Sequence, residues 1–121
     1  MEREIKELAY QLGADVCGIG SIDRFKDAPA GFSPLDIFDR CRSVIALGIA
    51  LPKGLYEVPP RLVYCHFSKL LCDVLDELVL KFAGILEKKY NCLAAPVPSD
   101  TPNEYWDAET MTSKGLISMR H

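Results

Sequence analysis

The sequence predicts a small α/β domain in which helices pack on a sheet of about three or more strands. Two segments repeat apolar residues at helical spacing, two short apolar runs have the character of buried strands, and the two kinds of segment alternate along the chain. A chain of 121 residues has the usual size of one domain. Residues 1–121 are therefore expected to share a single core.

The chain is expected to begin with a helix at residues 2–12. Ile5 and Leu12 lie on one helical face, and Gly13 follows where helices commonly end in a left-handed residue. The run DVCGIG at residues 15–20 is short, apolar and bounded by glycine. These features are typical of a buried strand.

A second, short helix and a central strand are expected next. Ser33 provides a capping hydroxyl, Pro34 occupies the first helical position and Asp36 completes a capping box. This helix is expected to end near Asp39. The run SVIALGIAL at residues 43–51 is nearly all apolar, which predicts a strand that is covered on both faces.

The longest periodic segment covers residues 61–90. A continuous helix of this length would measure about 45 Å, which favours a frayed start. Gly84 falls on the polar side, where it costs about 1 kcal/mol relative to alanine without leaving a hole in the core. The apolar side is formed by Phe67, Leu71, Val74, Leu75, Leu78, Phe82, Ile85 and Leu86.

Two further elements are expected in the last third of the chain. NCLAAPV at residues 91–97 is apolar enough for a third strand, and strands joined through helices are usually parallel. Residues 101–104 form a second capping-box pattern, and residues 107–109 are expected to begin another helical turn.

Composition and charge exclude several classes of protein. A net charge of −3 without a basic stripe argues against nucleic-acid binding, and no apolar run approaches the roughly 20 residues that span a bilayer. The charged start of the chain does not resemble a cleavable signal, so a cytoplasmic protein is expected. The chain is expected to make no contact with a membrane.

The cysteines are expected to be buried thiols, and no metal site is expected. No two of them are paired at the two-residue interval of metal and redox motifs, although Cys65 and Cys72 share one helix face and leave a metal contact open. The five cysteines are Cys17, Cys41, Cys65, Cys72 and Cys92.

The stretch PSDTPNEYWD at residues 98–107 contains most of the candidate cofactor-binding residues. Helix capping leaves four of its side chains unexplained, and open α/β sheets tend to hold ligands just beyond a strand. Packing in a core or interface is the alternative. Basic residues near residue 120 are able to contact an anionic ligand, with a solvated chain end as the alternative. The candidates are Ser99, Asp100, Tyr105, Trp106, Lys114 and Arg120.

Three segments resemble the N-terminal part of the epoxyqueuosine reductase-like iron–sulfur proteins, a family related to corrinoid-dependent reductive dehalogenases. They are LGADVCGIGSIDRF (residues 12–25), CRSVIALGIALP (residues 41–52) and APVPSDTPNEYWDAETMTSKGLISMRH (residues 95–121). The first two are the more specific, because their glycines and the CRSVI entry to a strand occur in the family's order. The resemblance spans nearly all of this chain and about half of such a family member.

The resemblance implies a nitroreductase-like fold that holds cobalamin and receives electrons from 4Fe-4S clusters. The cysteines of this chain do not match a cluster spacing, so the chain by itself is not expected to hold the clusters. The family's catalytic acid has no counterpart in MTSKGLIS at residues 111–118, and tRNA is a partner only by family analogy. The family implies that residues 99–106 and 114–121 approach the cofactor cavity.

Two functions are expected from these observations. The first is a domain that supplies part of a corrinoid or flavin pocket to an oxidoreductase of this family. The second is a noncatalytic α/β module that acts through self-association or a partner protein. Apolar residues near the end of the chain, Leu116 and Ile117, are expected to lack cover, and uncovered apolar surfaces recruit partners. A homo-oligomer or a complex with a partner chain is therefore expected.

Overall fold

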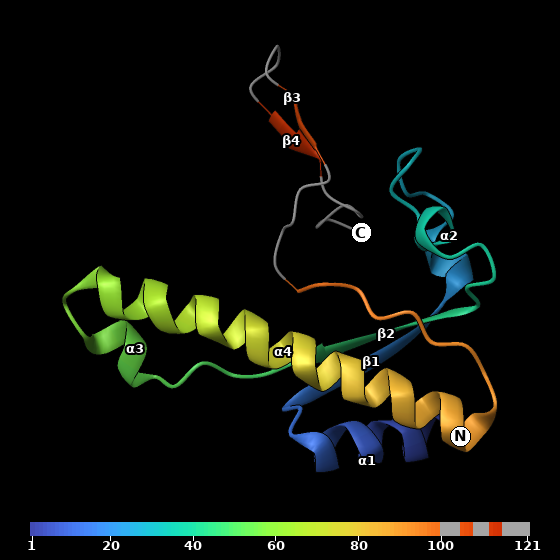
Figure 1. Ribbon diagram of the computed structural model, residues 1–121, viewed down its shortest axis with the longest axis horizontal. Coiled ribbons are helices and arrows are strands. Elements are labelled where there is room, and N and C mark those ends of the chain that lie inside the picture. The colour runs from blue at the N-terminus through green and yellow to red at the C-terminus, as the bar shows by residue number, and fades with distance from the viewer. Residues whose placement is uncertain (100–104, 108–111, 115–121) are drawn as a thin grey trace. The chain divides into compact units, whose positions relative to one another are not determined.

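The computed structural model describes residues 1–99 and the backbone of two short strands, Tyr105–Asp107 and Thr112–Lys114 (Figure 1). Contacts divide the chain into two compact units, Met1–Gly18 with Ala46–Asp100 and Ile19–Ile45 with Thr101–His121. Both helices and strands are present, which confirms the α/β prediction, while the single core for the whole chain stays a prediction. The elements in order are α1 (Glu2–Leu12), β1 (Val16–Ser21), η1 (Ile22–Phe25), α2 (Pro34–Ile37), β2 (Ser43–Gly48), α3 (Gly54–Glu57), α4 (Arg61–Tyr90), β3 (Tyr105–Asp107) and β4 (Thr112–Lys114).

Helix α1 has the predicted bounds and ends in a left-handed residue at Gly13. Gly13 has a φ of 118° and its N–H donates to the Tyr10 carbonyl, while the Ala14 N–H donates to the Ala9 carbonyl at 3.0 Å. These bonds satisfy carbonyls that the helix end leaves open. A residue with a Cβ is strained at this φ, which explains the glycine.

Helix α2 begins with the capping box that the sequence predicts. The Ser33 N–H donates to the Asp36 carboxylate at 2.9 Å, and the Leu35 N–H donates to the Ser33 hydroxyl oxygen at 3.3 Å. The helix ends at Ile37 instead of Asp39, because Phe38 already has an extended backbone with φ −143° and ψ 101°.

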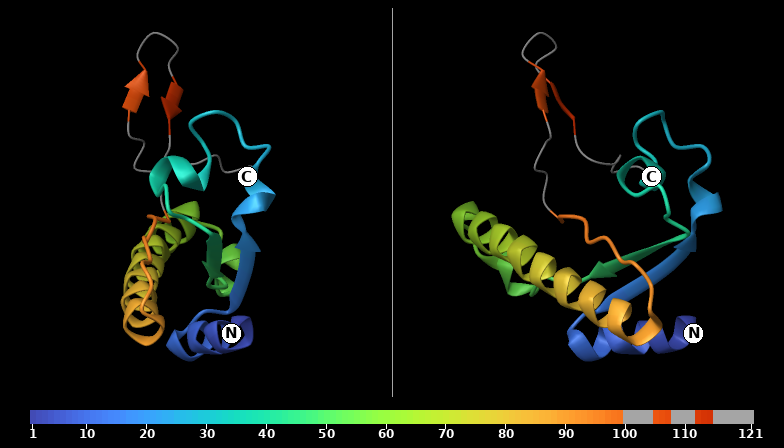
Figure 2. Two further views of the ribbon diagram at one scale, coloured as in Figure 1. Left: turned by 90° about the vertical axis from the view of Figure 1, so that its right-hand side faces the viewer. Right: turned by 45° about the vertical axis from the view of Figure 1, so that its right-hand side comes forward.

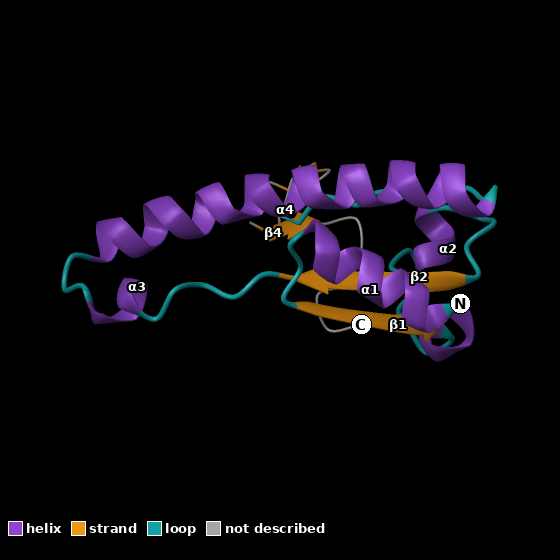
Figure 3. Ribbon diagram, turned by 90° about the horizontal axis from the view of Figure 1, so that it is seen from below, coloured by secondary structure: helices purple, strands orange, loops and turns teal. Residues whose placement is uncertain are grey.

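Strands β1 and β2 pair with each other in a two-stranded sheet, and Figure 3 shows them side by side. The Asp15 N–H donates to the Gly48 carbonyl at 2.8 Å, and the Ile22 N–H donates to the Arg42 carbonyl at 2.9 Å. The residue numbers increase along β1 while those of their partners in β2 decrease, so the two strands are antiparallel. The expectation of parallel pairing is wrong. The reason is that only one-turn helices connect these strands, whereas parallel pairing needs a full crossover.

The strands are less buried than the sequence predicts. No residue of β1 or β2 is fully buried, and Val16 is 62% exposed. A sheet of two strands gives each strand only one neighbour, so neither can be covered as a central strand is. The expected strand at residues 43–51 also ends earlier, at Gly48.

Helix α4 is continuous over 30 residues, so the expected fraying at its start is not found. It ends at Tyr90, and the next residue, Asn91, has a left-handed backbone and donates its N–H to the Glu87 carbonyl. A Cβ built on Gly84 meets nothing within 4 Å, as expected for a residue outside the core. No helix among the described residues has both the length and the apolar character needed to cross a membrane.

Two shorter helices contact the long helix at its ends within the first unit. Helix α3 lies beside the start of α4, where the rings of Tyr56 and Tyr64 are 5.5 Å apart. Helix α1 lies along the C-terminal half of α4 (Figure 2), and the Tyr90 hydroxyl donates to the Glu4 carboxylate at 3.1 Å. The buried apolar residues of the described chain are Ala9, Ala14, Leu78, Phe82, Ala83 and Leu86.

The expected third strand at residues 91–97 does not form, and this segment has no regular secondary structure. Pro96 and Pro98 have no N–H to donate to a sheet. The Ala94 N–H donates instead to the Glu87 carboxylate of α4 at 3.0 Å. The segment therefore bonds to side chains of the long helix and not to a neighbouring strand.

The helical turn expected at residue 107 is also wrong. Tyr105–Asp107 forms strand β3, which pairs antiparallel with β4. Tyrosine, tryptophan and threonine favour extended backbone, and this preference outweighs the helix-start pattern that precedes them. The capping-box pattern at residues 101–104 lies outside the described residues.

Candidate functional site

Ser99 is held against α4 by two hydrogen bonds. Its hydroxyl donates to the Cys72 carbonyl at 2.8 Å, and its N–H donates to the Asp76 carboxylate at 2.8 Å. The bond to Cys72 reaches a carbonyl in the middle of the helix, so Ser99 fixes the position of the segment that leaves α4. The prediction that Ser99 binds a cofactor stays a prediction.

The other described candidates belong to the strand pair β3–β4. Tyr105 lies opposite Lys114 and Trp106 lies opposite Ser113 in the antiparallel register. Residues directly opposite in such a pair have Cα atoms about 4.5–5.5 Å apart. The pairing therefore brings Tyr105 and Trp106 close to Lys114, although Lys114 follows them by nine and eight residues in the sequence.

Two candidates, Asp100 and Arg120, lie outside the described residues. Ser99 belongs to the first compact unit, whereas Tyr105, Trp106 and Lys114 belong to the second. The described structure thus separates the candidates into an anchor on α4 and a group at one strand pair.

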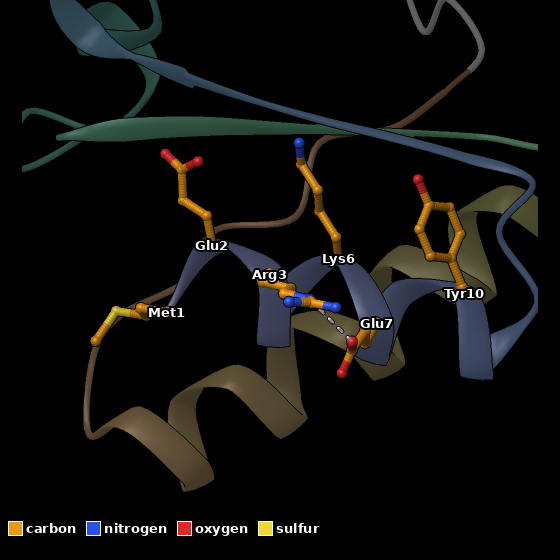
Figure 4. Close-up of a pocket in the computed structure, with 6 residues that line it drawn as sticks. All are labelled: Met1, Glu2, Arg3, Lys6, Glu7 and Tyr10. Atoms are coloured by element: carbon orange, nitrogen blue, oxygen red, sulfur yellow. Dashed lines mark ion pairs between the residues drawn. The ribbon is translucent and has the colours of Figure 1, made fainter.

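An open hollow lies beside α1, and none of the residues that line it is a candidate from the sequence (Figure 4). Glu2, Lys6 and Tyr10 point to the same side of the helix, and Arg3 forms an ion pair with Glu7 at 3.6 Å. One helix and the residue before it supply all of the lining, so no second wall encloses a ligand. The lining residues are Met1, Glu2, Arg3, Lys6, Glu7 and Tyr10.

The cysteines are not the buried thiols that the sequence predicts. Cys65 and Cys92 are exposed and the other three are half-buried, because the core is too small to enclose them. Burial raises the pKa of the Cys17 thiol, while the Lys6 ammonium acts in the opposite direction. A raised pKa keeps this thiol protonated near neutral pH, which disfavours a nucleophilic role.

No cluster of metal-binding side chains occurs within the described part of the chain. Within those residues, no three histidine, cysteine, aspartate or glutamate side chains lie close enough together to hold one metal ion. An iron–sulfur cluster takes four ligands, usually cysteines. The described residues therefore do not fit a cluster.

The surface that sequence analysis missed is an exposed apolar face on α4. Phe67 and Val74, expected in the core, are 46% and 43% exposed. The spacing of the sequence indicates this face, because Leu62, Leu70 and Leu80 fall on the side of the helix that was expected to be polar. We define the exposed apolar face of α4 as Leu62, Phe67, Leu70, Val74 and Leu80.

Replacing Ser99 with alanine is expected to loosen the segment at residues 92–99 and to destabilise its docked form by about 1 kcal/mol. The variant loses the hydroxyl that donates to Cys72. Hydrogen exchange of the backbone amides of residues 94 and 99 should become faster in the variant.

The matched control is Ser68→Ala, since the Ser68 hydroxyl also donates to a carbonyl of α4, that of Cys65, but from within the helix. This control should leave amide exchange at residues 92–99 unchanged. Equal exchange rates in Ser99→Ala and the unmodified chain would contradict the anchoring role.

Comparisons of the chain with protein-family models, with curated proteins and with solved structures found no match.

Proposed function

We propose that this chain is the N-terminal domain of an epoxyqueuosine reductase-like iron–sulfur oxidoreductase and that it contributes part of a corrinoid or flavin pocket. The observation that supports this proposal is the pairing of β1 with β2. These strands lie within the two segments of more specific resemblance, at residues 12–25 and 41–52. Segments that resemble one family and also pair with each other are consistent with a shared local fold.

The proposal extends this sheet into a larger, nitroreductase-like one with three or more strands. Open α/β sheets bind ligands beyond the ends of their strands, and aromatic residues often line such sites. Tyr105, Trp106 and Lys114 are the candidates whose backbones are held together by β3 and β4. Ser99, Asp100 and Arg120 complete the proposed cofactor-binding set.

The proposal assigns no iron–sulfur cluster to this chain, because its described residues do not fit one. A bound corrinoid or flavin would supply the redox chemistry, and the chain would bind and orient it. The proposal places the protein in the cytoplasm, where free cysteines remain reduced. It includes tRNA only by analogy with the family.

Titration with hydroxocobalamin or with flavin mononucleotide tests this function. Trp106 is the one tryptophan of the chain, so its fluorescence reports directly on the proposed site. Saturable quenching, together with a shift of the cofactor's visible spectrum, is the expected result for one of the two. Free N-acetyltryptophanamide, titrated in parallel, corrects for light absorbed by the cofactor.

Two variants locate the binding in this titration. Trp106→Ala, whose titration is followed by the visible spectrum of the cofactor because the variant contains no tryptophan, should weaken the affinity at least about tenfold, a change of about 1.4 kcal/mol that is usual for one aromatic contact. Tyr10→Ala, in the hollow beside α1, should leave the affinity unchanged. A titration that never saturates with either cofactor would overturn the proposal.

A second function is favoured by the exposed apolar face of α4. In this function the chain is a noncatalytic α/β module that acts through self-association or through a partner protein. Five large apolar side chains of one helix are exposed, and apolar side chains that gather on one surface mark interaction sites in soluble proteins.

A further inference from the structure

The exposed apolar face of α4 lies away from the elements that pack on this helix. Helix α3 contacts the start of α4, α1 contacts its C-terminal half, and Ser99 bonds to Cys72 and Asp76. Leu62, Leu70 and Leu80 are 78%, 48% and 64% exposed, so none of these elements covers them. The face runs from Leu62 to Leu80, a distance of about 27 Å at 1.5 Å per residue.

The residues of this face lie in two neighbouring stripes of α4. The residues of the first stripe follow one another at alternating spacings of four and three residues. The stripe begins and ends with a leucine and has charged residues between them. Such spacing keeps side chains in one line along a helix. Its members are Leu62, His66, Lys69, Asp73, Asp76 and Leu80. The second stripe contains Phe67, Leu70 and Val74, and it supplies the apolar contact area.

The first stripe is complementary in charge to the same stripe of a second helix that runs in the opposite direction. Leu62 and Leu80 lie nine residues before and after Leu71, and Lys69 and Asp73 lie two residues before and after it. A second copy turned end to end about Leu71 therefore places leucine against leucine and a base against an acid.

This pattern distinguishes an antiparallel pair of helices from a parallel one. In an antiparallel pair each flank meets the same flank of the other helix in reverse, so Lys69 faces Asp73 of the second copy. In a parallel pair the charged flank of one copy faces the second stripe of the other, where Phe67, Leu70 and Val74 offer no charge. A two-fold arrangement of this kind forms the same contact twice.

We propose that two copies of this chain associate through α4, antiparallel and centred on Leu71. Phe67, Leu70 and Val74 of each copy supply the apolar contact, and Lys69 pairs with Asp73 of the other copy across the two-fold axis. The inference deepens the second function above by naming the partner as a second copy of this chain. It does not depend on cofactor binding.

Sedimentation of the chain at about 1–200 µM in reducing buffer tests the association, since a contact of one helix pair is expected to have micromolar affinity. The reductant excludes disulfides through the exposed Cys65 and Cys92. A concentration-dependent dimer is expected, and Leu70→Glu should abolish it. The control Leu93→Glu changes another exposed leucine, outside α4, and should leave the dimer intact. Circular dichroism verifies that both variants remain helical.

Charge reversal then tests the orientation. Lys69→Glu and Asp73→Lys should each weaken the dimer about tenfold, because each replaces two attractive pairs with repulsive ones. A mixture of the two variants should recover the affinity as a heterodimer, since positions 69 and 73 are both acidic in one copy and both basic in the other. The chain with both changes should recover it as well.

Each outcome bears on the inference separately from the proposed functions. A monomer at every concentration would overturn this inference and remove self-association from the second function. A dimer that survives Leu70→Glu would overturn the α4 contact while leaving self-association standing. A dimer lost in Leu70→Glu but not recovered in the charge-reversed mixture would overturn the antiparallel arrangement. Failure of the cofactor titration would leave all three results unaffected.

Discussion

Replacing Phe82 with alanine is expected to lower the free energy of unfolding by about 3–5 kcal/mol, the usual cost of removing a buried phenylalanine. Phe82 is only 4% exposed and is the largest side chain among the buried residues, three of which are alanines. Neighbouring side chains relax only in part around such a deletion, so a cavity remains where the ring was. Urea unfolding followed by circular dichroism measures the loss.

This loss is large for a small protein, because total stabilities are about 5–15 kcal/mol. The matched control is Lys81→Ala, the preceding residue of the same helix, whose side chain is exposed. It should change the unfolding free energy by less than about 0.5 kcal/mol. Equal losses in the two variants would show that α4 has no core centred on Phe82.

Replacing Gly48 with alanine is expected to destabilise the chain by about 1–3 kcal/mol, the usual cost of forcing an extra group into occupied space. A Cβ at this position would lie 2.6 Å from Cγ2 of Val16 on the neighbouring strand. Valine is stiff about its first side-chain torsion, so it cannot easily move aside. Either the side chain or the strand pair must shift.

Two further variants separate this clash from a general effect of removing glycine. Gly18→Ala adds the same methyl group to β1, where nothing lies within 4 Å, and should leave stability nearly unchanged. Combining Gly48→Ala with Val16→Ala removes the atom that clashes and should recover most of the loss. If Gly18→Ala proved as costly as Gly48→Ala, the close approach of the strands would not be the cause.

Local features of the fold were predictable wherever neighbours in sequence determine the structure. Gly13 marks the end of α1, and Ser33 with Asp36 starts α2, because capping hydrogen bonds join residues only a few positions apart. The apolar run that forms β2 was also predictable, since its composition disfavours other structures.

The errors concern contacts between residues that lie further apart in the chain than a capping hydrogen bond spans. Residues 91–97 are apolar enough for a strand, yet the carboxylates of Glu87 and Asp76 take the N–H groups of Ala94 and Ser99. Of the candidate site, the sequence indicated the polar and aromatic residues, but the pairing of Tyr105 with Lys114 depends on a register that spacing does not encode.

The sequence by itself determined where helices start and end, because capping and periodicity act within a few residues. Tertiary structure alone decided which side of α4 is covered: α1 packs on its C-terminal half, where Phe82 is buried, and Phe67 and Leu70 are left exposed. Both sides of the helix carry leucines, so the hydrophobic effect favours burying either one. The side of α4 that is buried depends on where α1 and Ser99 contact the helix. The hydrophobic effect has no preferred direction, so it cannot select one side without these contacts.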